Sequence, residues 1–258
     1  MNHIDITFDM ETCATTANAA VMQVAAVVWD RSAKENPFSV GDGSAVAFDY
    51  SGIPDAPPNI ISFNEHIDLR TCVVDGFDFD QATIKWWANQ TDKAKKAVTD
   101  GLAEPIEEVF IRFIEWINQV KKDTKAESVC LWCQGMDFDG AILRNICHKY
   151  DLELPFRYQQ FRDCRTLILE TAVIQVSIYT IDNSETAGMM CADGSVIKPK
   201  DILQQPCKAY KIYKQLPEDI IESGTVHDAM YDCICSSWNT WQALGIINEC
   251  LIRPAING

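Results

Sequence analysis

The strongest constraint on the fold lies at residues 5–14, DITFDMETCA, where an apolar run ends in two carboxylates, Asp9 and Glu11. Side chains on a β-strand alternate between its two faces, so positions 9 and 11 point to the same side. Two carboxylates this close repel each other, and one of them would take up a proton unless a positive charge lay between them. The pattern therefore predicts a core strand that ends at an incomplete site for a divalent cation.

The composition predicts a protein of the cytoplasm. The chain has 258 residues, of which 47% are hydrophobic, enough for one large domain or two small ones. We interpret residues 1–258 as a single domain. The N-terminus does not resemble a signal peptide, and no window approaches the roughly 18 apolar residues of a membrane span. Eleven cysteines without a framework spacing indicate reduced thiols in a cytosol.

The net charge of −15 has the wrong sign for a protein that binds nucleic acid by bulk electrostatics. An acidic chain can still act on nucleic acid if its phosphate contacts are local, through a bound metal or a basic patch. The net charge alone argues against a polynucleotide substrate, so such a substrate must be supported by specific sequence motifs.

The apolar pattern predicts a mixed α/β sheet with helices on its faces. The expected strands are His3–Asp9, Ala20–Asp30, Ile60–Leu69, Ser128–Gln134 and Tyr158–Asp163, and the expected helices are Asp80–Gln90, Pro105–Lys121, Phe138–Tyr150, Arg165–Thr171 and Asp228–Leu244. The proline-rich stretch Asn36–Asn59 predicts loops around a short strand near Ala45–Tyr50. Residues 175–205 are interpreted as an insertion, because residues 180–205 lack a clean period.

Further candidate site residues lie at the ends of predicted elements. The stretch QGMDFDGAILR places Asp139 at the start of a helix that follows a buried strand. In HDAMYD, His227 precedes Asp232 by five residues, which is not a same-face spacing on a helix. We therefore expect His227 in the loop before the helix, with Asp228 as its N-cap, free to face the same point as Asp232.

These motifs resemble those of a known enzyme superfamily. FDMET resembles the first motif of the DEDD exonucleases, D-x-E, and GMDFDGAIL resembles the second. HDAMYD matches the third motif of the histidine subclass, because residue 228 is Asp where the tyrosine subclass would have Tyr. The stretches FNEHIDLR, ATIKWWANQ, ILRNICHKY and FRDCRTL are similar to the branch that contains the T-even phage exodeoxyribonuclease and a mycobacterial 3′-5′ exoribonuclease.

The resemblance implies a ribonuclease H-like fold and two Mg²⁺ or Mn²⁺ ions about 3.5–4 Å apart. It implies that Asp9 bridges the ions, that Glu11 and Asp232 complete the site of the ion on the nucleophile side, and that Asp139 binds the second ion. Hard cations prefer oxygen ligands, which fits a set made of carboxylates.

The resemblance also implies a 3′-5′ exonuclease that releases nucleoside 5′-monophosphates from single-stranded nucleic acid. His227 would be the general base, Glu11 would contact the terminal 3′-hydroxyl, and Met10 would pack near the terminal nucleotide. DNA is slightly favoured because of the phage member of the branch, with RNA as the alternative. The cytoplasm of a bacterium or of a phage-infected cell is the expected location, and the oligomeric state stays open, with a homodimer as one option. The rival interpretations are a non-catalytic nucleic-acid-binding domain, which would be expected to lack motif residues, and an endonuclease.

Other notable residues favour structural roles. We interpret Asp163 in FRDCRTL as a helix cap, His148 as a structural residue, and the C-x-x-C pair of Cys130 and Cys133 as buried thiols, because no second pair stands at zinc-site spacing.

Two features leave a role in nucleic-acid binding open. Trp86 and Trp87 are adjacent on a predicted helix, so at least one must belong to the core while the other could stack on a base. The stretch Lys198–Lys214 contains five lysines and is either a solvated face or a local grip on nucleic acid.

Overall fold

A computed structural model describes residues 3–40, 60–183, 188–191, 193–217 and 224–256. The predicted short strand near Ala45–Tyr50 lies outside the described residues, as does most of the stretch Asn36–Asn59.

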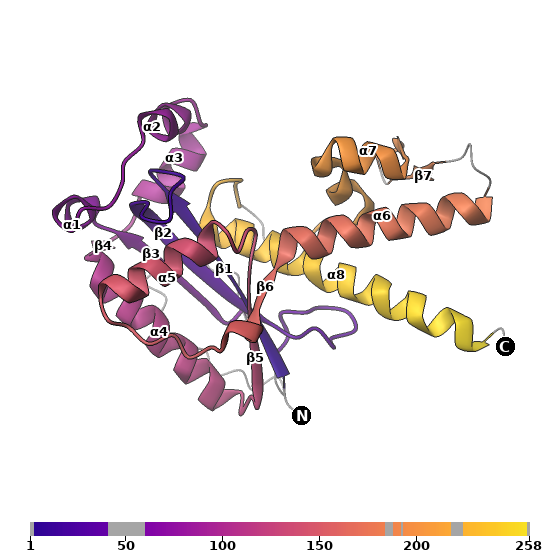
Figure 1. The fold of residues 1–258 in the computed structure, drawn as a ribbon, viewed down its shortest axis with the longest axis horizontal. Helices are drawn as coiled ribbons and strands as arrows, with labels where there is room; N and C mark the ends of the chain where they lie inside the picture. Colours follow the sequence, from indigo (N-terminus) through magenta and orange to yellow (C-terminus); the bar gives the residue numbers. More distant parts are fainter. Residues whose placement is uncertain (1–2, 41–59, 184–187, 192, 218–223, 257–258) are drawn as a thin grey trace.

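A six-stranded mixed sheet forms the centre of the fold, in the order β4-β3-β2-β1-β5-β6 (Figure 1). The strands are β1 (His3–Thr12), β2 (Val21–Trp29), β3 (Ser62–Ile67), β4 (Ala103–Glu104), β5 (Ser128–Cys133) and β6 (Phe161–Asp163). β2 runs antiparallel to both of its neighbours, whereas β1, β5 and β6 are mutually parallel. The predicted mixed sheet is confirmed.

Helices cover both faces of this sheet and extend beyond it. They are α1 (Leu69–Val74), α2 (Gln81–Ala88), α3 (Asp92–Thr99), α4 (Ile106–Asp123), α5 (Asp139–Lys149), α6 (Cys164–Asn183), α7 (Pro199–Gln204) and α8 (Ala229–Ile256), with 3₁₀ turns η1 (Tyr158–Gln160) and η2 (Pro206–Ile212) and a small hairpin of β7 (Met189–Met190) and β8 (Val196–Ile197). Among the described residues, none of the helices combines the length and the apolar character that crossing a bilayer requires.

The two faces of the sheet have different partners. Even-numbered residues of β1 and β2, such as Phe8 and Val24, pack in one apolar cluster with α4 and α5. Odd-numbered residues of β2, such as Trp29, pack in a second cluster with α6 and α8. The odd-numbered residues of β1 also face that side, because side chains alternate along a strand. They are polar, namely Asp5, Thr7, Asp9 and Glu11.

Two helices are longer than the sequence predicts. The prediction ends one helix at Thr171, but α6 continues to Asn183 because Ala172 and Val176 are buried against residues around β8 and α7. The first part of the predicted insertion 175–205 therefore belongs to α6, beside which α7 lies (Figure 1). The last helix was expected to end at Leu244 but continues through Gly245, since one helical glycine costs only about 1 kcal/mol.

Helices α1 and α3 are absent from the prediction. They have 6 and 8 residues, too short for a clear apolar period. Each starts at a capping side chain, Asp68 before α1 and Thr91 before α3, which accepts a backbone hydrogen bond from the first turn.

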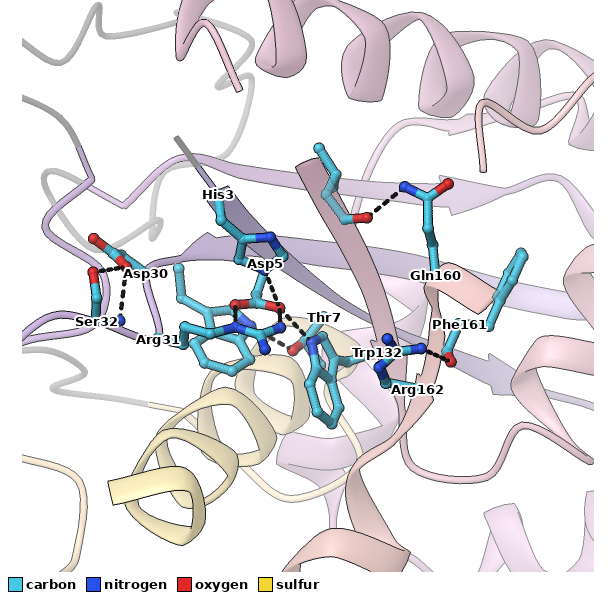
Figure 2. Close-up of polar contacts among 12 residues, drawn as sticks. His3, Asp5, Thr7, Asp30, Arg31, Ser32, Trp132, Gln160, Phe161 and Arg162 are labelled. Atoms are coloured by element: carbon cyan, nitrogen blue, oxygen red, sulfur yellow. Dashed lines mark hydrogen bonds and ion pairs between the residues drawn. The ribbon is translucent and has the colours of Figure 1, made fainter. Parts of the chain in front are cut away.

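A buried ion pair fixes the N-terminal half of β1 (Figure 2). The Asp5 carboxylate is fully buried and accepts hydrogen bonds from Arg31 Nε at 2.8 Å and Trp132 Nε1 at 2.7 Å, and His3 Nε2 lies 3.2 Å away. Burial disfavours its charge, but the hydrogen bonds with His3 and Arg31 outweigh this and lower the pKa of Asp5. This carboxylate is therefore a satisfied structural anion.

We predict that the contribution of His3 to the free energy of unfolding decreases at alkaline pH. Its hydrogen bond with Asp5 is the largest cause that raises the pKa of His3 to about 9. Because the folded-state pKa exceeds the unfolded value of about 6.5, the contribution is complete below pH 6.5 and is lost as pH rises through 9. Because the His3 ring is partly exposed and solvent screens the interaction, the full effect is on the order of 1–2 kcal/mol.

Urea unfolding of the wild-type protein and of His3→Gln between pH 6 and pH 10 measures this contribution. The difference between the two free energies of unfolding should shrink as pH rises, whereas His148→Gln, an exposed position on α5, should show no such trend. A constant difference would contradict the prediction.

Candidate active site

The first two site residues share one face of β1. Asp9 pairs with Ala25 of β2 and Glu11 pairs with Gln23, so both carboxylates project toward the side that α8 covers. Directly after Glu11 the register with β2 shifts by a bulge, which ends the regular ladder at the site. The predicted same-side arrangement of Asp9 and Glu11 is thus present.

The parallel pairing of β1 and β5 brings Asp139 to the same edge of the sheet. β5 ends at Cys133, and the chain enters α5 with Asp139 as its first residue. Asp139 is only 2% exposed, and its Oδ1 atom has no hydrogen-bond partner among the described residues. A buried carboxylate oxygen without a partner is costly, so this atom is open to a bound ion or a water molecule.

His227 and Asp232 lie at the start of α8. His227 stands in a turn closed by the bond from Asp228 N–H to the Thr225 carbonyl oxygen, and its φ of 68° is in the left-handed region. Its backbone N–H donates to Asp232 Oδ2 at 3.1 Å, while Asp228 caps the helix by accepting from Met230 N–H at 3.2 Å. The predicted position of His227 before the helix and the predicted cap at Asp228 are both confirmed.

Three of the predicted residues meet closely. A carboxylate oxygen of Glu11, a carboxylate oxygen of Asp232 and a ring nitrogen of His227 all lie within 4.8 Å of one another. A left-handed backbone in a non-glycine residue costs about 1–3 kcal/mol and persists only where the surroundings enforce it. His227 has this strained backbone, and its ring nitrogen lies near the carboxylates of Glu11 and Asp232.

The electrostatics of the cluster are those of like charges without a counter-ion. Burial, followed by the charges of Asp139 and Glu11, raises the pKa of Asp9 well above its usual range. Burial and then Asp232 raise the pKa of Glu11 to about 8. Burial also raises the pKa of Asp139 to about 7 and that of Asp232 to about 6. These four carboxylates fit a hard divalent cation, which prefers oxygen ligands and would stabilise their charged forms.

Aromatic rings border the imidazole. The Trp86 ring lies edge-on to His227 with centroids 4.7 Å apart, and Trp86 is 43% exposed. Trp87 is 8% exposed and donates from Nε1 to the Thr12 carbonyl oxygen at 2.9 Å. As predicted, one of the two tryptophans belongs to the core. Burial also lowers the pKa of His227, which favours a neutral ring that can accept a proton.

Met10 occupies the opposite face of β1. It is 3% exposed and belongs to the cluster packed against α4 and α5, away from Asp9 and Glu11. Its backbone is near the Asp139 carboxylate and favours the charged form of that group. The predicted contact of Met10 with a terminal nucleotide stays a prediction, and only its main chain is available for it in this structure.

Gln23 is a residue of the site that sequence reasoning missed. It is 1% exposed, and its amide nitrogen donates to Asn64 and to Asp228 Oδ1, at 3.0 Å each. Its amide oxygen accepts from Ala229 N–H at 3.1 Å. Gln23 thus joins the centre of the sheet to the start of α8. The signal was present in the sequence, since Gln23 alone interrupts the apolar run AVMQVAAVV.

The residues expected to be structural are placed accordingly. Asp163 caps α6 through the bond from Thr166 N–H to Oδ1 at 2.7 Å, and its Oδ2 accepts from Met136 N–H at 3.0 Å in the loop before Asp139. Cys130 and Cys133 are buried free thiols in the clusters on opposite faces of the sheet, so they cannot share a metal ion.

The lysine-rich stretch Lys198–Lys214 includes α7 and η2. Lys200, Lys211 and Lys214 are exposed, and Lys211 pairs with Asp193 at 2.9 Å. These contacts fit a solvated face, and a grip on nucleic acid stays a prediction.

We predict that Gln23→Leu destabilises the protein by about 1–3 kcal/mol, because the buried Ala229 N–H loses its acceptor without regaining water. Asn64→Ala removes only one of the three bonds and should cost less. Urea unfolding of the two variants beside the wild-type protein measures both costs. Equal losses would show that the bonds to the start of α8 contribute nothing.

The sequence of the chain matches, over residues 4–188, the family described as the 3′-5′ exoribonuclease Rv2179c-like domain. The matched region contains Asp9, Glu11 and Asp139, whereas His227 and Asp232 follow it. No curated protein sequence gives a significant match.

Several solved nuclease structures are distantly similar. Cell-death related nuclease 4 (CRN-4) shares 15% identity at a TM-score of 0.45, with 95% of this chain and 64% of that chain covered. The zinc-bound E. coli ExoI–ssDNA complex shares 13% at 0.46, with 99% and 41% covered. The nuclease domain of 3′hExo, a DEDDh family member bound to rAMP, shares 11% at 0.43, with 95% and 92% covered. The chain thus spans less than two thirds of the length of the first two.

The family match carries the assignment. It covers more than two thirds of the chain and includes the central strands and three of the four clustered carboxylates. It also confirms the resemblance to 3′-5′ exonucleases from which the site residues were assigned. The protein belongs to the Rv2179c-like 3′-5′ exoribonuclease domain family.

Proposed function

We propose that the protein is a metal-dependent 3′-5′ exonuclease that shortens single-stranded nucleic acid by one nucleoside 5′-monophosphate at a time. The observation that carries the proposal is the convergence of four carboxylates with raised pKa values, beside an imidazole with a lowered pKa, at one edge of the sheet. A purely structural cluster would contain its own counter-charge, as Asp5 does with Arg31.

The carboxylates are proposed to hold two Mg²⁺ or Mn²⁺ ions. Asp9 would bridge the ions, Glu11 and Asp232 would hold the first, and the unpartnered Oδ1 of Asp139 would bind the second. When bound, such ions activate water for attack on a phosphodiester and stabilise the charge of the leaving oxygen.

The remaining chemistry belongs to the chain's own side chains. The His227 ring nitrogen near Glu11 and Asp232 accepts a proton from the attacking water, because its depressed pKa keeps it neutral. Water adds to phosphorus, and the bond to the 3′-oxygen of the retained strand breaks. Glu11 contacts the terminal 3′-hydroxyl, and the exposed Trp86 shields the imidazole from solvent on one side.

We propose RNA as the preferred strand, since the matching family is described as exoribonuclease-like. The resemblance to the branch with the phage enzyme slightly favours DNA, and that preference stays a prediction to be tested beside RNA. The homodimer also stays a prediction.

Metal binding should stabilise the protein. A ligand that binds only the folded state stabilises it, so at pH 8 a hundredfold excess of Mg²⁺ or Mn²⁺ over its dissociation constant should add about 2.7 kcal/mol. Asp139→Asn removes one charge, which should raise the melting temperature of the metal-free protein and reduce the gain from metal. Thermal melts in EDTA and in each metal measure both effects. Glu115→Gln, an exposed position on α4, is the control, and an unreduced metal gain in Asp139→Asn would contradict the assignment.

Exonuclease activity should appear as a ladder that shortens from the 3′ end. One 5′-labelled sequence, made as RNA and as DNA, is incubated with the protein and either metal, with an EDTA control. EDTA and Asp9→Asn should abolish the ladder. His227→Asn should lower the rate by about 10²–10⁴-fold, because asparagine tolerates a left-handed backbone and keeps the N–H bond to Asp232 but cannot accept a proton.

The same gel decides between strands and between functions. A faster ladder on DNA than on RNA would reverse the proposed preference. No ladder on either strand with either metal would reject the nuclease and favour a nucleic-acid-binding domain. An unimpaired His227→Asn would remove the base from the mechanism.

A further inference from the structure

Arg165 lies at the end of a third strand that terminates at the edge of the active site. β1, β5 and β6 are parallel neighbours, so their carboxyl ends meet at one edge of the sheet. The first end carries Glu11, the second leads to Asp139, and the third leads to Arg165 in the first turn of α6. Ligands of open α/β sheets bind outside the carboxyl ends of strands.

The Arg165 side chain is exposed but anchored at one nitrogen. Its Nη2 atom donates to the Gln134 carbonyl oxygen at 2.6 Å, in the loop between β5 and α5. Burial raises the pKa of Asp139, and the nearby charge of Arg165 acts in the opposite direction. Within the described ranges, Arg165 forms no ion pair and no second hydrogen bond, so the other N–H groups of its exposed side chain have no partner there.

The anchor of Arg165 is itself held from two sides. Gln134 Nε2 donates to Ser236 Oγ of α8 at 2.5 Å, and Gln134 Oε1 accepts from the Tyr210 hydroxyl of η2 at 3.3 Å. The loop that supports the guanidinium is therefore fixed by a helix of the active site and by the segment beside α6. Such support restricts the position of the guanidinium without occupying its remaining N–H groups.

We infer that Arg165 binds the first internucleotide phosphate of the retained strand, next to the scissile linkage on its 5′ side. This inference rests on the proposed function, which places the terminal nucleoside at Glu11 on β1. β6 lies two strands from β1, about 10 Å away, beyond the position of Asp139. A guanidinium matches phosphate oxygens in a two-point contact. In a chain of net charge −15, attraction for a polyanion must come from local groups of this kind.

Short substrates separate this role from a structural one. The dinucleotide NpN, with a free 5′-hydroxyl, contains only the scissile phosphate, whereas the trinucleotide NpNpN also contains the phosphate assigned to Arg165. Steady-state hydrolysis of both is measured with the full-length wild-type protein, Arg165→Gln, Arg165→Lys and the control Arg162→Gln. Arg162 is an exposed arginine of the same motif, and in the described part of the chain its side chain bonds only to the carbonyl oxygens of Gln159 and Phe161.

In Arg165→Gln, kcat/KM for the trinucleotide should fall at least tenfold more than kcat/KM for the dinucleotide, mainly through KM. Arg165→Lys should recover part of that loss, and Arg162→Gln should match the wild-type protein. A methylphosphonate at the 5′ linkage of the trinucleotide should penalise the wild-type protein more than Arg165→Gln.

The outcomes are distinguishable. Equal losses on both substrates, or a methylphosphonate penalty that Arg165→Gln leaves unchanged, would overturn the phosphate contact and assign Arg165 to the support of Asp139. Failure of the wild-type protein to cleave any substrate would instead overturn the proposed function, and the inference with it.

Discussion

The structure depends on a strand that is buried on both faces but apolar on only one. Even-numbered side chains of β1 join the core beneath α4 and α5, while Asp5, Asp9 and Glu11 lie on the face toward α6 and α8. Burying a carboxylate is costly unless it is paired. Asp5 is paired internally by Arg31, whereas Asp9 and Glu11 lie among further acids, with the His227 imidazole beside Glu11. β1 therefore carries one carboxylate that is paired with an arginine, Asp5, and two that form no such pair among the described residues, Asp9 and Glu11.

Several contacts around Asp9 and Glu11 hold the acidic residues of the site close together. Parallel pairing of β1 with β5 brings Asp139 to the carboxyl end of β1, and Asp163 fixes the loop that precedes it. Gln23 holds the start of α8 on the sheet. Hydrogen bonds of this kind orient the acids without neutralising them, which leaves their repulsion to be relieved by a ligand.

Much of this arrangement could be predicted from sequence, because the information was local. The period of a strand places Asp9 and Glu11 of the D-x-E pattern on one side. The period of a helix places His227 before α8, and Asp139 stands at the predicted start of α5. The strand order and the contact of Trp86 with His227 join residues far apart in the chain, so no short pattern encodes them. Gln23 was overlooked because its partner Asp228 is 205 positions away. The lengths of α6 and α8 depend on tertiary packing, which overrides weak helix-ending signals.

The turn that carries His227 has a further consequence. Asp9 and Glu11 lie on a central strand, whose amides exchange with solvent only when the whole domain opens. His227 stands outside any helix or strand, in a strained turn held by one backbone–backbone bond and by the bond from its N–H to the Asp232 carboxylate. We expect the turn to open locally at a lower free-energy cost than the central strand. On gradual heating, proton transfer is expected to stop while the sheet is still folded, so inactivation should precede the unfolding transition seen by circular dichroism.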